Sequence, residues 1–372
     1  MSAATETASH HQPLPDRSPP VTEVGLIGWL RKNLFSSISN TILTVLGIYL
    51  IWLVVPPILD WVIFDANFVG DSRDACTGSG ACWVFIKVRI SQFMYGFYPA
   101  DERWRINLAG IIAVICIAWL VIERLPYKRY VGFFALVPFP ILCYFLFRGG
   151  LGLADVETAK WGGLFLTLVI SSVGIVASLP IGILLALGRR SELPVIRLLC
   201  TGFIEMIRGV PLITLLFMAS VMLPLFLPEG VTFNKLARAL VIVALFASAY
   251  IAEVVRGGLQ AIPKGQYEAA SAMGLTYWKS MMLIILPQAL KLVIPGLVNT
   301  LIGLFKDTTL VLIIGLFDLL NIAQTAVTST AWLGLANEGY FFVGLIFWIF
   351  CFGMSRYSIF LESKLDTGHS KR

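Results

Sequence analysis

Eight apolar stretches, each long enough to cross a bilayer, constrain this chain more than any other feature of its sequence. A helix needs about 20 residues to cross the ~30 Å of hydrocarbon in a membrane. Hydrophobic residues make up 58% of the 372 residues and charged residues only 13%, against about 25% charged in a typical soluble domain. The sequence therefore predicts an all-α, polytopic membrane protein with about eight transmembrane helices. These stretches centre near Tyr49, Val114, Ala135, Gly174, Phe217, Leu245, Leu304 and Phe347.

The positions of the basic residues predict the orientation of these helices. Placing the N-terminus in the cytoplasm puts 17 of the 28 Lys and Arg residues on that side and nine outside, with Arg208 and Lys306 inside spans. Cytoplasmic loops of membrane proteins carry an excess of Lys and Arg. We therefore attribute the net charge of +6 to topology and not to binding of nucleic acid. Both termini are expected to be cytoplasmic.

The two ends of the chain differ from the rest in composition. The first 30 residues carry four prolines among Ser, Thr and His, and such a stretch buries too little apolar surface to fold. Residues 1–30 and 363–372 are therefore expected to be cytoplasmic tails, the first of them disordered. The first apolar run begins beyond Asn33, too far in and too long for a secretory signal, so it is expected to be a retained span.

The segment 60–105, after the first span, is expected to be an outer loop. Cys76 and Cys82 bracket Thr-Gly-Ser-Gly-Ala there, a flexible tether that lets two thiols reach disulfide distance on an oxidising side. The sequence leaves a disulfide and two free thiols as equal alternatives. Apolar residues from Trp83 to Phe97 then recur at helical spacing, as in a helix that lies on the outer leaflet or packs on the bundle.

A polar and basic segment, 256–291, separates two of the C-terminal spans on the cytoplasmic side. It contains Glu268-Ala269-Ala270, then Gly274, then Ile284-Ile285-Leu286-Pro287. Gly274 is suited to end a short helix in the left-handed conformation that a residue with a Cβ resists. The pattern predicts two short helices joined at Gly274, which would form a knob at the membrane surface. The alternative is an ordinary amphipathic hairpin.

Two adjacent charges interrupt the seventh span near its middle. Lys306 and Asp307 stand among about 25 uncharged residues, and an ionisable group at that depth costs at least ~2.5 kcal/mol unless it is paired or faces a wet cavity. An α-amino acid carries a carboxylate and an ammonium group, so a Lys and an Asp that line one cavity complement the part that all amino acids share. The alternative is that the two pair with each other or with a neighbouring subunit.

Two further spans contain charged residues. Glu205 and Arg208 stand at positions i and i+3, which favours an ion pair within one helix. Tyr250 and Glu253 share one face of the next span, and Arg256 follows one turn later. These five side chains are expected either to contribute to the substrate pathway or to fix helix packing through intramembrane pairs.

No nucleotide-binding or catalytic motif accompanies these features. The chain has no GxxxxGK[ST] loop and no soluble α/β domain, so it is not expected to bind or hydrolyse ATP itself. It also lacks HExxH, GxSxG and Cys/His clusters, and its three histidines, His10, His11 and His369, lie in the predicted tails. The sequence therefore offers no catalytic residue, metal site or bound cofactor.

Several of these motifs resemble one family of transport proteins. The polar amino-acid permeases of ABC importers have similar segments from about residue 158 to the C-terminus, although Val210 stands here in place of the family's Thr in Arg-Gly-Thr-Pro. The N-terminal spans, with Tyr95-Gly96-Phe97-Tyr98-Pro99, look like the long M-type subunit of bacterial general L-amino-acid importers. The similar segments are Arg208-Gly209-Val210-Pro211, Ala249 to Gly258, Glu268-Ala269-Ala270 with Gly274, and Lys306-Asp307-Thr308-Thr309-Leu310.

The resemblance implies a bacterial inner-membrane subunit that moves polar or general L-amino acids from periplasm to cytoplasm. It implies three extra helices in residues 31–150, with a periplasmic loop at 60–105, and a five-helix permease core in residues 151–362. Segment 256–291 would then be the loop that couples this core to an ATPase. The coupling residues would be Glu268, Ala269, Ala270, Gly274, Ile284, Leu286 and Pro287.

The resemblance also implies partners. These are a second, homologous permease, a dimer of ATPases that carry ATP and Mg²⁺, and a periplasmic amino-acid-binding protein. An ion-coupled secondary transporter is the alternative, with Lys306 and Asp307 as coupling groups. That class predicts inverted internal repeats, which are not evident here, and it does not explain segment 256–291.

Overall fold

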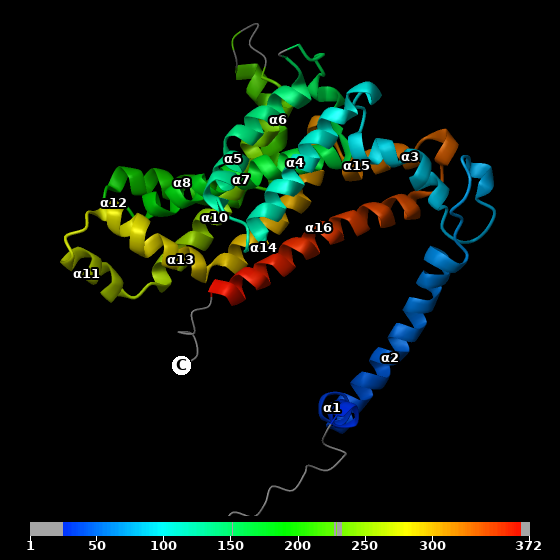
Figure 1. Cartoon of the computed structure of the whole chain (residues 1–372), viewed down its shortest axis with the longest axis horizontal. Coiled ribbons are helices and arrows are strands. Elements are labelled where there is room, and N and C mark those ends of the chain that lie inside the picture. Colours follow the sequence, from blue (N-terminus) through cyan, green and yellow to red (C-terminus); the bar gives the residue numbers. More distant parts are fainter. Residues whose placement is uncertain (1–24, 151, 227, 229–232, 366–372) are drawn as a thin grey trace, which may run out of the picture. The chain divides into compact units, whose positions relative to one another are not determined.

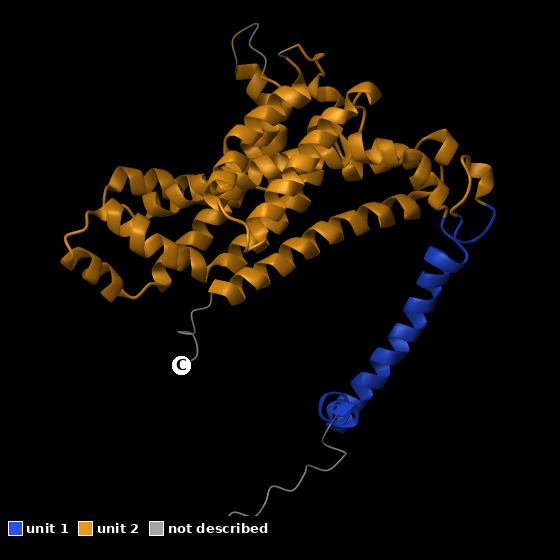
Figure 2. Ribbon diagram, viewed as in Figure 1, with its two compact units in different colours: residues 1–67, 77–81 blue, residues 68–76, 82–372 orange. Residues whose placement is uncertain are grey.

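The computed structural model describes residues 25–150, 152–226, 228 and 233–365, most of them in helices (Figure 1). Two compact units divide the chain: residues 1–67 with 77–81, and residues 68–76 with 82–372 (Figure 2). The second and third of the expected extra spans belong to the second unit. The predicted tails lie largely outside the described residues, but the first helix already begins at Gly25.

The first unit consists of α1 (Gly25–Asn33) and α2 (Ile38–Leu59), which continues as a π-helical turn to Phe64. Ser37 caps α2 by accepting a hydrogen bond from the backbone N–H of Asn40 at 3.1 Å. Among the described residues, no side chain of α2 is buried. A helix that is apolar on every side is suited to contact lipid or another subunit.

The second unit contains the remaining helices and one two-residue strand, β1 (Phe317–Asp318). Short 3₁₀ turns at 73–75, 100–102, 158–160, 223–226, 308–314 and 330–332 and π-helical turns at 218–222 and 281–285 connect or extend them. The helices are α3 (Trp83–Tyr95), α4 (Arg103–Val121), α5 (Lys128–Leu136), α6 (Pro138–Arg148), α7 (Gly163–Arg189), α8 (Pro194–Gly209), α9 (Leu212–Phe217), α10 (Lys235–Ala261), α11 (Lys264–Ala272), α12 (Tyr277–Ser280), α13 (Leu286–Leu292), α14 (Ile294–Asp307), α15 (Leu319–Val327) and α16 (Ala336–Leu365).

Each of the eight apolar stretches predicted from the sequence has its central residue in a candidate membrane span. Within the described residues, six helical segments are long and apolar enough to cross a membrane, and two bent pairs raise the number to eight if each pair is one span. The pairs are α5 with α6, bent by 40°, and α8 with the segment Leu212–Phe226, bent by 102°. The prediction of an all-α membrane protein with about eight spans is confirmed.

Helices α7 and α10 form the centre of the second unit. They approach closely at Gly182, where a Cβ would stand 2.5 Å from the Ile251 side chain, so any larger residue would push them apart. The side chains buried between them include Ile170, Val243 and Ile251. This rigid pair carries the charged residues of α7 and α10 described below.

Helix α3 packs on the bundle. Phe85 and Phe93 are fully buried in a cluster with side chains of α15 and α16, whereas Ile90 and Phe97 of the predicted apolar face are 40% and 46% exposed. Of the two alternatives for this helix, packing on the bundle is therefore the one observed, on a face rotated from the one that the spacing suggested.

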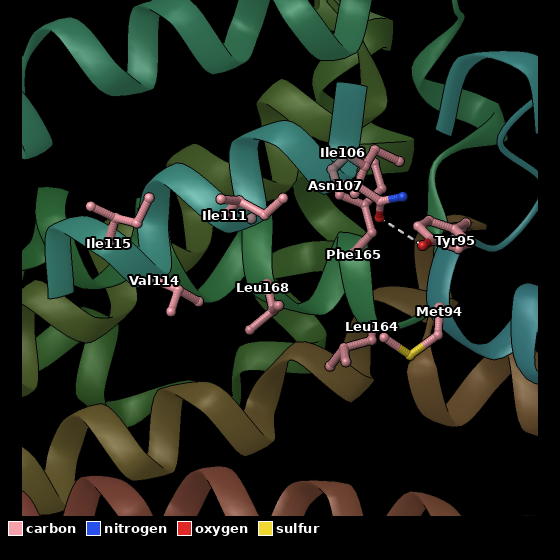
Figure 3. A pocket seen from close by; sticks show the side chains of 11 residues that line it. Met94, Tyr95, Ile106, Asn107, Ile111, Val114, Ile115, Leu164, Phe165 and Leu168 are labelled. Carbon is pink, nitrogen blue, oxygen red and sulfur yellow. Dashed lines mark hydrogen bonds between the residues drawn. The ribbon is translucent and has the colours of Figure 1, made fainter. Parts of the chain in front are cut away.

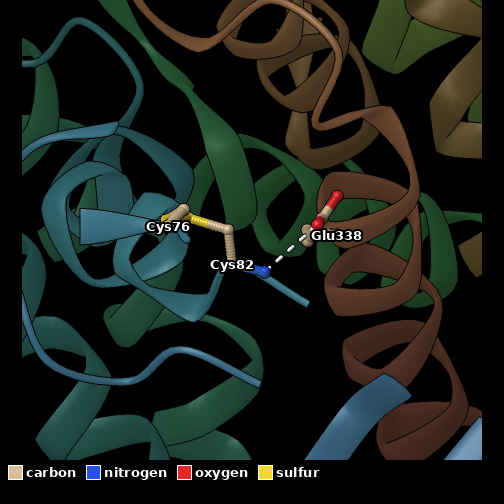
Figure 4. The surroundings of a disulfide bond; sticks show 3 residues. All are labelled: Cys76, Cys82 and Glu338. Carbon is tan, nitrogen blue, oxygen red and sulfur yellow. Dashed lines mark hydrogen bonds between the residues drawn. A yellow bond between two sulfur atoms is a disulfide. The ribbon is translucent and has the colours of Figure 1, made fainter. Parts of the chain in front are cut away.

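A disulfide joins Cys76 and Cys82, whose Cα atoms lie 5.6 Å apart (Figure 4). The backbone N–H of Cys82 donates to the buried Glu338 carboxylate at 3.1 Å, which ties the start of α3 to the first turn of α16. This hydrogen bond joins elements that are more than 250 residues apart in sequence, and the disulfide holds the residue that donates it.

Candidate functional site

The predicted knob is present and is built from α11, α12, the π-helical turn at 281–285 and the start of α13. Gly274 has φ +71°, and its N–H donates to the Ser271 carbonyl at 2.9 Å, while the Leu275 N–H donates to the Ala270 carbonyl at 3.2 Å. These two bonds make a Schellman cap, which satisfies the last carbonyls of α11 and needs the left-handed conformation at Gly274. The turn directs the chain from α11 into α12.

The residues of the predicted coupling motif divide into an anchor and an exposed face. Ala270 and Ile285 are fully buried and Leu286 nearly so, and the latter two pack in a core cluster with side chains of α7, α8 and α10. Ile284 is partly buried against the same cluster. The motif is therefore attached to the helical core mainly through its C-terminal part.

Much of the rest of the knob is exposed, with large apolar side chains among charged ones. Glu268, Ala269, Gly274 and Pro287 are exposed, as are several large side chains close to them. An exposed apolar patch on a rigid base is typical of a surface that contacts another protein. Those large side chains are Met273, Tyr277, Trp278, Met282 and Leu283, between 51% and 69% exposed.

Arg190, at the C-terminal end of α7, contacts the knob. Its guanidinium donates to the Tyr267 hydroxyl at 3.1 Å and lies 5.6 Å from the centroid of that ring. The Tyr267 hydroxyl in turn donates to the Leu259 carbonyl of α10 at 2.9 Å. Tyr267 of α11 is thus held between the ends of α7 and α10.

The neighbouring Arg189 belongs to a charged network that joins α7, α8 and α10. The carboxylate of Glu253, with 16% of its side chain exposed, pairs with Arg189, with Arg256 at 2.8 Å and with Arg208 at 3.7 Å. Arg189 also pairs with Glu205 at 2.9 Å. Because most of the Glu253 side chain is covered, removing its basic partners would leave a largely buried carboxylate uncompensated.

The expected ion pair between Glu205 and Arg208 does not form. Although the two lie one turn apart on α8, Glu205 pairs with Arg189, and Arg208 lies near Glu253 and 5.5 Å from the ring centroid of Tyr250. Partners on α7 and α10 are closer than the partner on the same helix. Glu253 does pair with Arg256, which follows it by one turn on α10.

The chain changes direction sharply before Pro211. Helix α8 ends at Gly209, Val210 is extended with φ −116° and ψ 134°, and the chain turns by 102° into α9. Proline has no N–H to donate and disfavours helical geometry in the residue before it. The bend places Arg208 at the end of α8, next to the network.

Lys306 and Asp307 stand at the end of α14, apart from this network. Lys306 is exposed and Asp307 half-buried, and neither has an ion-pair partner within 4.0 Å in the described part of the chain. The helix changes here from α to 3₁₀, which continues from Thr308 to Ile314. The predicted pathway residues therefore form two groups and not one.

Asp318 is a buried acid that sequence reasoning did not single out. It is fully buried and caps α15, accepting from the backbone N–H of Asn321 at 3.1 Å, while its Oδ2 has no partner. Burial raises the pKa of this carboxyl to about 6, against the lowering effect of its hydrogen bonds to Asn321. An Asp directly before an apolar helical run is the N-cap signal that identifies it.

Comparison with known proteins agrees with this geometry. The family described as "Binding-protein-dependent transport system inner membrane component" matches residues 178–366, which contain the network, the knob and the Lys306–Asp307 pair. The inner membrane amino-acid ABC transporter permease protein YhdY of Escherichia coli is 60% identical over 92% of this chain and 94% of its own length.

A second relative and a solved structure are also similar. The glutamate/glutamine/aspartate/asparagine transport system permease protein BztC of Rhodobacter capsulatus is 41% identical over 96% of this chain and 97% of its own length. A solved amino acid ABC transporter with histidines is 30% identical, with a TM-score of 0.49 over 54% of this chain and 92% of its own. The chain therefore belongs to the inner membrane components of binding-protein-dependent transport systems, as its motifs predicted.

Proposed function

We propose that this chain is one of two permeases in an ATP-driven importer of polar L-amino acids. The observation that carries the proposal is the knob, because its anchored base and exposed face suit a surface on which a separate ATPase acts. The relatives YhdY and BztC are by name an amino-acid ABC permease and a glutamate/glutamine/aspartate/asparagine permease. A polar amino acid is therefore the substrate class that we assign.

The exposed face of the knob would bind the ATPase. Glu268 offers a carboxylate for a basic side chain of the partner, and Trp278 an aromatic surface that is 57% exposed. Aromatic side chains in desolvated pockets supply much of the binding energy of protein interfaces. Both termini and the knob would be cytoplasmic, with the disulfide loop in the periplasm.

A movement of the knob would be transmitted to the substrate pathway through the C-terminal end of α7. Arg190 holds Tyr267 of the knob, and the adjacent Arg189 holds Glu253 and Glu205. A shift of α11 would therefore act on the ion pairs at the bend of α8. If these ion pairs exchanged partners in a second conformation, the network would supply the two-state element that alternating access needs.

Lys306 and Asp307 would contact the substrate in the space between this chain and a second permease. Their lack of partners within the described part of the chain leaves both charges to be compensated from outside it. The ammonium group of an amino acid suits Asp307, and its carboxylate suits Lys306. An ion-coupled secondary transporter is disfavoured because it requires no exposed docking surface.

Reconstitution tests the proposal. The two permeases, the ATPase and the binding protein are placed in proteoliposomes, and uptake of radiolabelled glutamate, glutamine and lysine is followed with and without ATP. Uptake should require ATP and should be insensitive to an ionophore that abolishes ion gradients. Uptake driven by an ion gradient without ATP would overturn the proposal.

Asp307→Asn tests the substrate contact in the same system. If Asp307 binds the shared ammonium group, transport of all three amino acids should fall about tenfold or more, since a hydrogen bond to a charged group contributes about 1.5–3 kcal/mol. Uptake is normalised to assembled complex. A loss confined to lysine would assign Asp307 to side-chain recognition, and undiminished uptake of all three would remove it from the site.

A further inference from the structure

An apolar groove lies between α3, α4 and α7 (Figure 3). Its volume is about 660 Å³, within the about 300–1,000 Å³ of typical ligand sites. Side chains of all three helices line it, among them Met94, Ile111, Phe165 and Leu168. The residues that we assign to coupling and to the substrate pathway do not line it, so the groove is a separate feature.

The α4 wall of the groove is a single stripe of the helix. Asn107, Gly110, Ile111 and Val114 follow one another at helical spacing and face the same side. From Ile106 to Ile115 the lining extends over ten residues, whose nine steps of rise make about 14 Å of helix. That length is close to the depth of one leaflet, which is half of the ~30 Å hydrocarbon core.

One end of the groove is polar. The Tyr95 hydroxyl donates to the side-chain carbonyl of Asn107 at 2.7 Å (Figure 3). Arg103 precedes Asn107 by one turn on the same stripe, and its guanidinium carbon lies 5.2 Å from the centroid of the Tyr95 ring. The groove is thus apolar along α4 and ends at a cation.

The charge of Arg103 is not neutralised by the protein. Its Nε donates to the Tyr98 carbonyl at 3.3 Å, and no carboxylate pairs with it among the residues that the structure describes. By contrast, the nearby Arg105 is buried and pairs with Glu102 at 2.6 Å. A planar guanidinium with free donors is suited to bind a phosphate.

We propose that this groove binds a membrane phospholipid, with one acyl chain along α4 and its phosphate at Arg103. A lipid satisfies both parts of the site, because it joins a flexible apolar chain of one leaflet's length to an anionic group at the interface. A transmembrane helix of another subunit would cover the apolar wall but would leave Arg103 uncompensated. A polar solute would bind only at the end near Asn107.

Photolabelling of the assembled transporter tests this site. The complex is placed in nanodiscs of phosphatidylcholine that contain phosphatidylglycerol with a diazirine on one acyl chain, and the labelled residues are located by mass spectrometry. Labelling at Ile111 and Leu168 should exceed labelling on the exposed side of α16, such as at Trp348, which is 58% exposed. Labelling of the groove no stronger than that of α16 would overturn the proposal.

Gly110→Leu is the variant that blocks the groove. A Cβ at Gly110 meets no atom within 4 Å, so a leucine side chain fills the space without displacing the backbone. Groove labelling should fall severalfold. Gly344→Leu is the matched control, because a Cβ at Gly344 on α16 also meets no atom within 4 Å. This variant should leave labelling of the groove unchanged. Unchanged labelling in Gly110→Leu would overturn the proposal.

Arg103→Gln separates the phosphate contact from the apolar contact. With this variant the groove should lose its preference for the phosphatidylglycerol probe over a diacylglycerol probe that has the same diazirine chain but no phosphate. An equal preference in wild type and variant would overturn the role of Arg103. Cross-linking of Ile111→Cys to α2 or to the second permease, with the groove unlabelled, would identify a protein occupant and overturn the lipid site.

Discussion

Gly274 fixes the direction of the chain between the two helices of the knob. Its φ of +71° costs an L-residue with a side chain about 1–2 kcal/mol, and no atom lies within 4 Å of a Cβ built there. The effect of a substitution at this position therefore comes from backbone strain and not from a clash.

We expect Gly274→Val to uncouple ATP hydrolysis from uptake while the complex still assembles. The branched side chain resists the left-handed conformation, which should shift α12 and its exposed aromatic residues. Substrate-stimulated ATP hydrolysis and uptake by the reconstituted complex are measured together, and Gly274→Ala should give a smaller defect.

Gly265→Ala is the matched control for Gly274→Ala. Gly265 lies in α11, has no neighbour within 4 Å of a built Cβ, and has no positive φ. It should therefore tolerate alanine without loss of coupling. Normal coupled transport in Gly274→Val would refute the role of the turn.

At the scale of elements, two adjacent arginines at the end of α7 link the knob to the bend of α8. Arg190 contacts Tyr267 of α11, and Arg189 contacts Glu205 of α8 and Glu253 of α10. Residues that are neighbours in sequence point in different directions on a helix, so one helix end can hold two elements at once. Loss of either contact should loosen that connection.

Removing the Tyr267 hydroxyl should lower the number of amino acids transported per ATP hydrolysed. Tyr267→Phe loses the hydrogen bonds to Arg190 and to the Leu259 carbonyl, about 0.5–1.5 kcal/mol each, but keeps the ring beneath the guanidinium. Arg190→Ala loses both interactions and should have the larger effect. The measurement is the ratio of uptake to ATP hydrolysis in proteoliposomes.

Tyr357→Phe is the control for Tyr267→Phe, since Tyr357 lies on α16 outside the knob and no hydrogen bond of its hydroxyl is found among the described residues. It should leave the ratio unchanged. An unaltered ratio in Arg190→Ala would show that coupling does not depend on this contact.

At the scale of the whole molecule, the positive-inside prediction places the disulfide loop and the knob on opposite sides of the membrane. In intact cells, Cys76 and Cys82 should not react with an impermeant maleimide until a reductant is added, because both sulfurs are in the bridge. Ser271→Cys, which is exposed on the knob, should react only after the membrane is permeabilised.

Mass spectrometry assigns the labelled cysteines in this experiment, so Cys116, Cys143, Cys200 and Cys351 need not be replaced. Labelling of Cys76 and Cys82 in untreated cells would show that they are free thiols. Labelling of Ser271→Cys from outside would reverse the orientation.

The sequence predicted features whose signal is local. A transmembrane span depends on about 20 consecutive residues, and all eight centres fall on helices of the structure. The left-handed turn at Gly274 depends on one residue without a Cβ and was also predicted. The Lys306–Asp307 pair was recognised because two adjacent charges within an apolar run have a cost that sequence alone reveals.

The partners of the charged residues were decided only by the tertiary structure. Arg189 is 16 residues from Glu205 and 64 from Glu253, so no local spacing indicates these pairs, and the local prediction of a Glu205–Arg208 pair was wrong. The groove along α4 likewise needs three helices whose approach is set by side-chain packing. By itself the sequence determined which segments enter the membrane and where the knob lies, because hydrophobicity and backbone conformation act locally. Which residues meet was left to the fold, because it depends on contacts between distant segments.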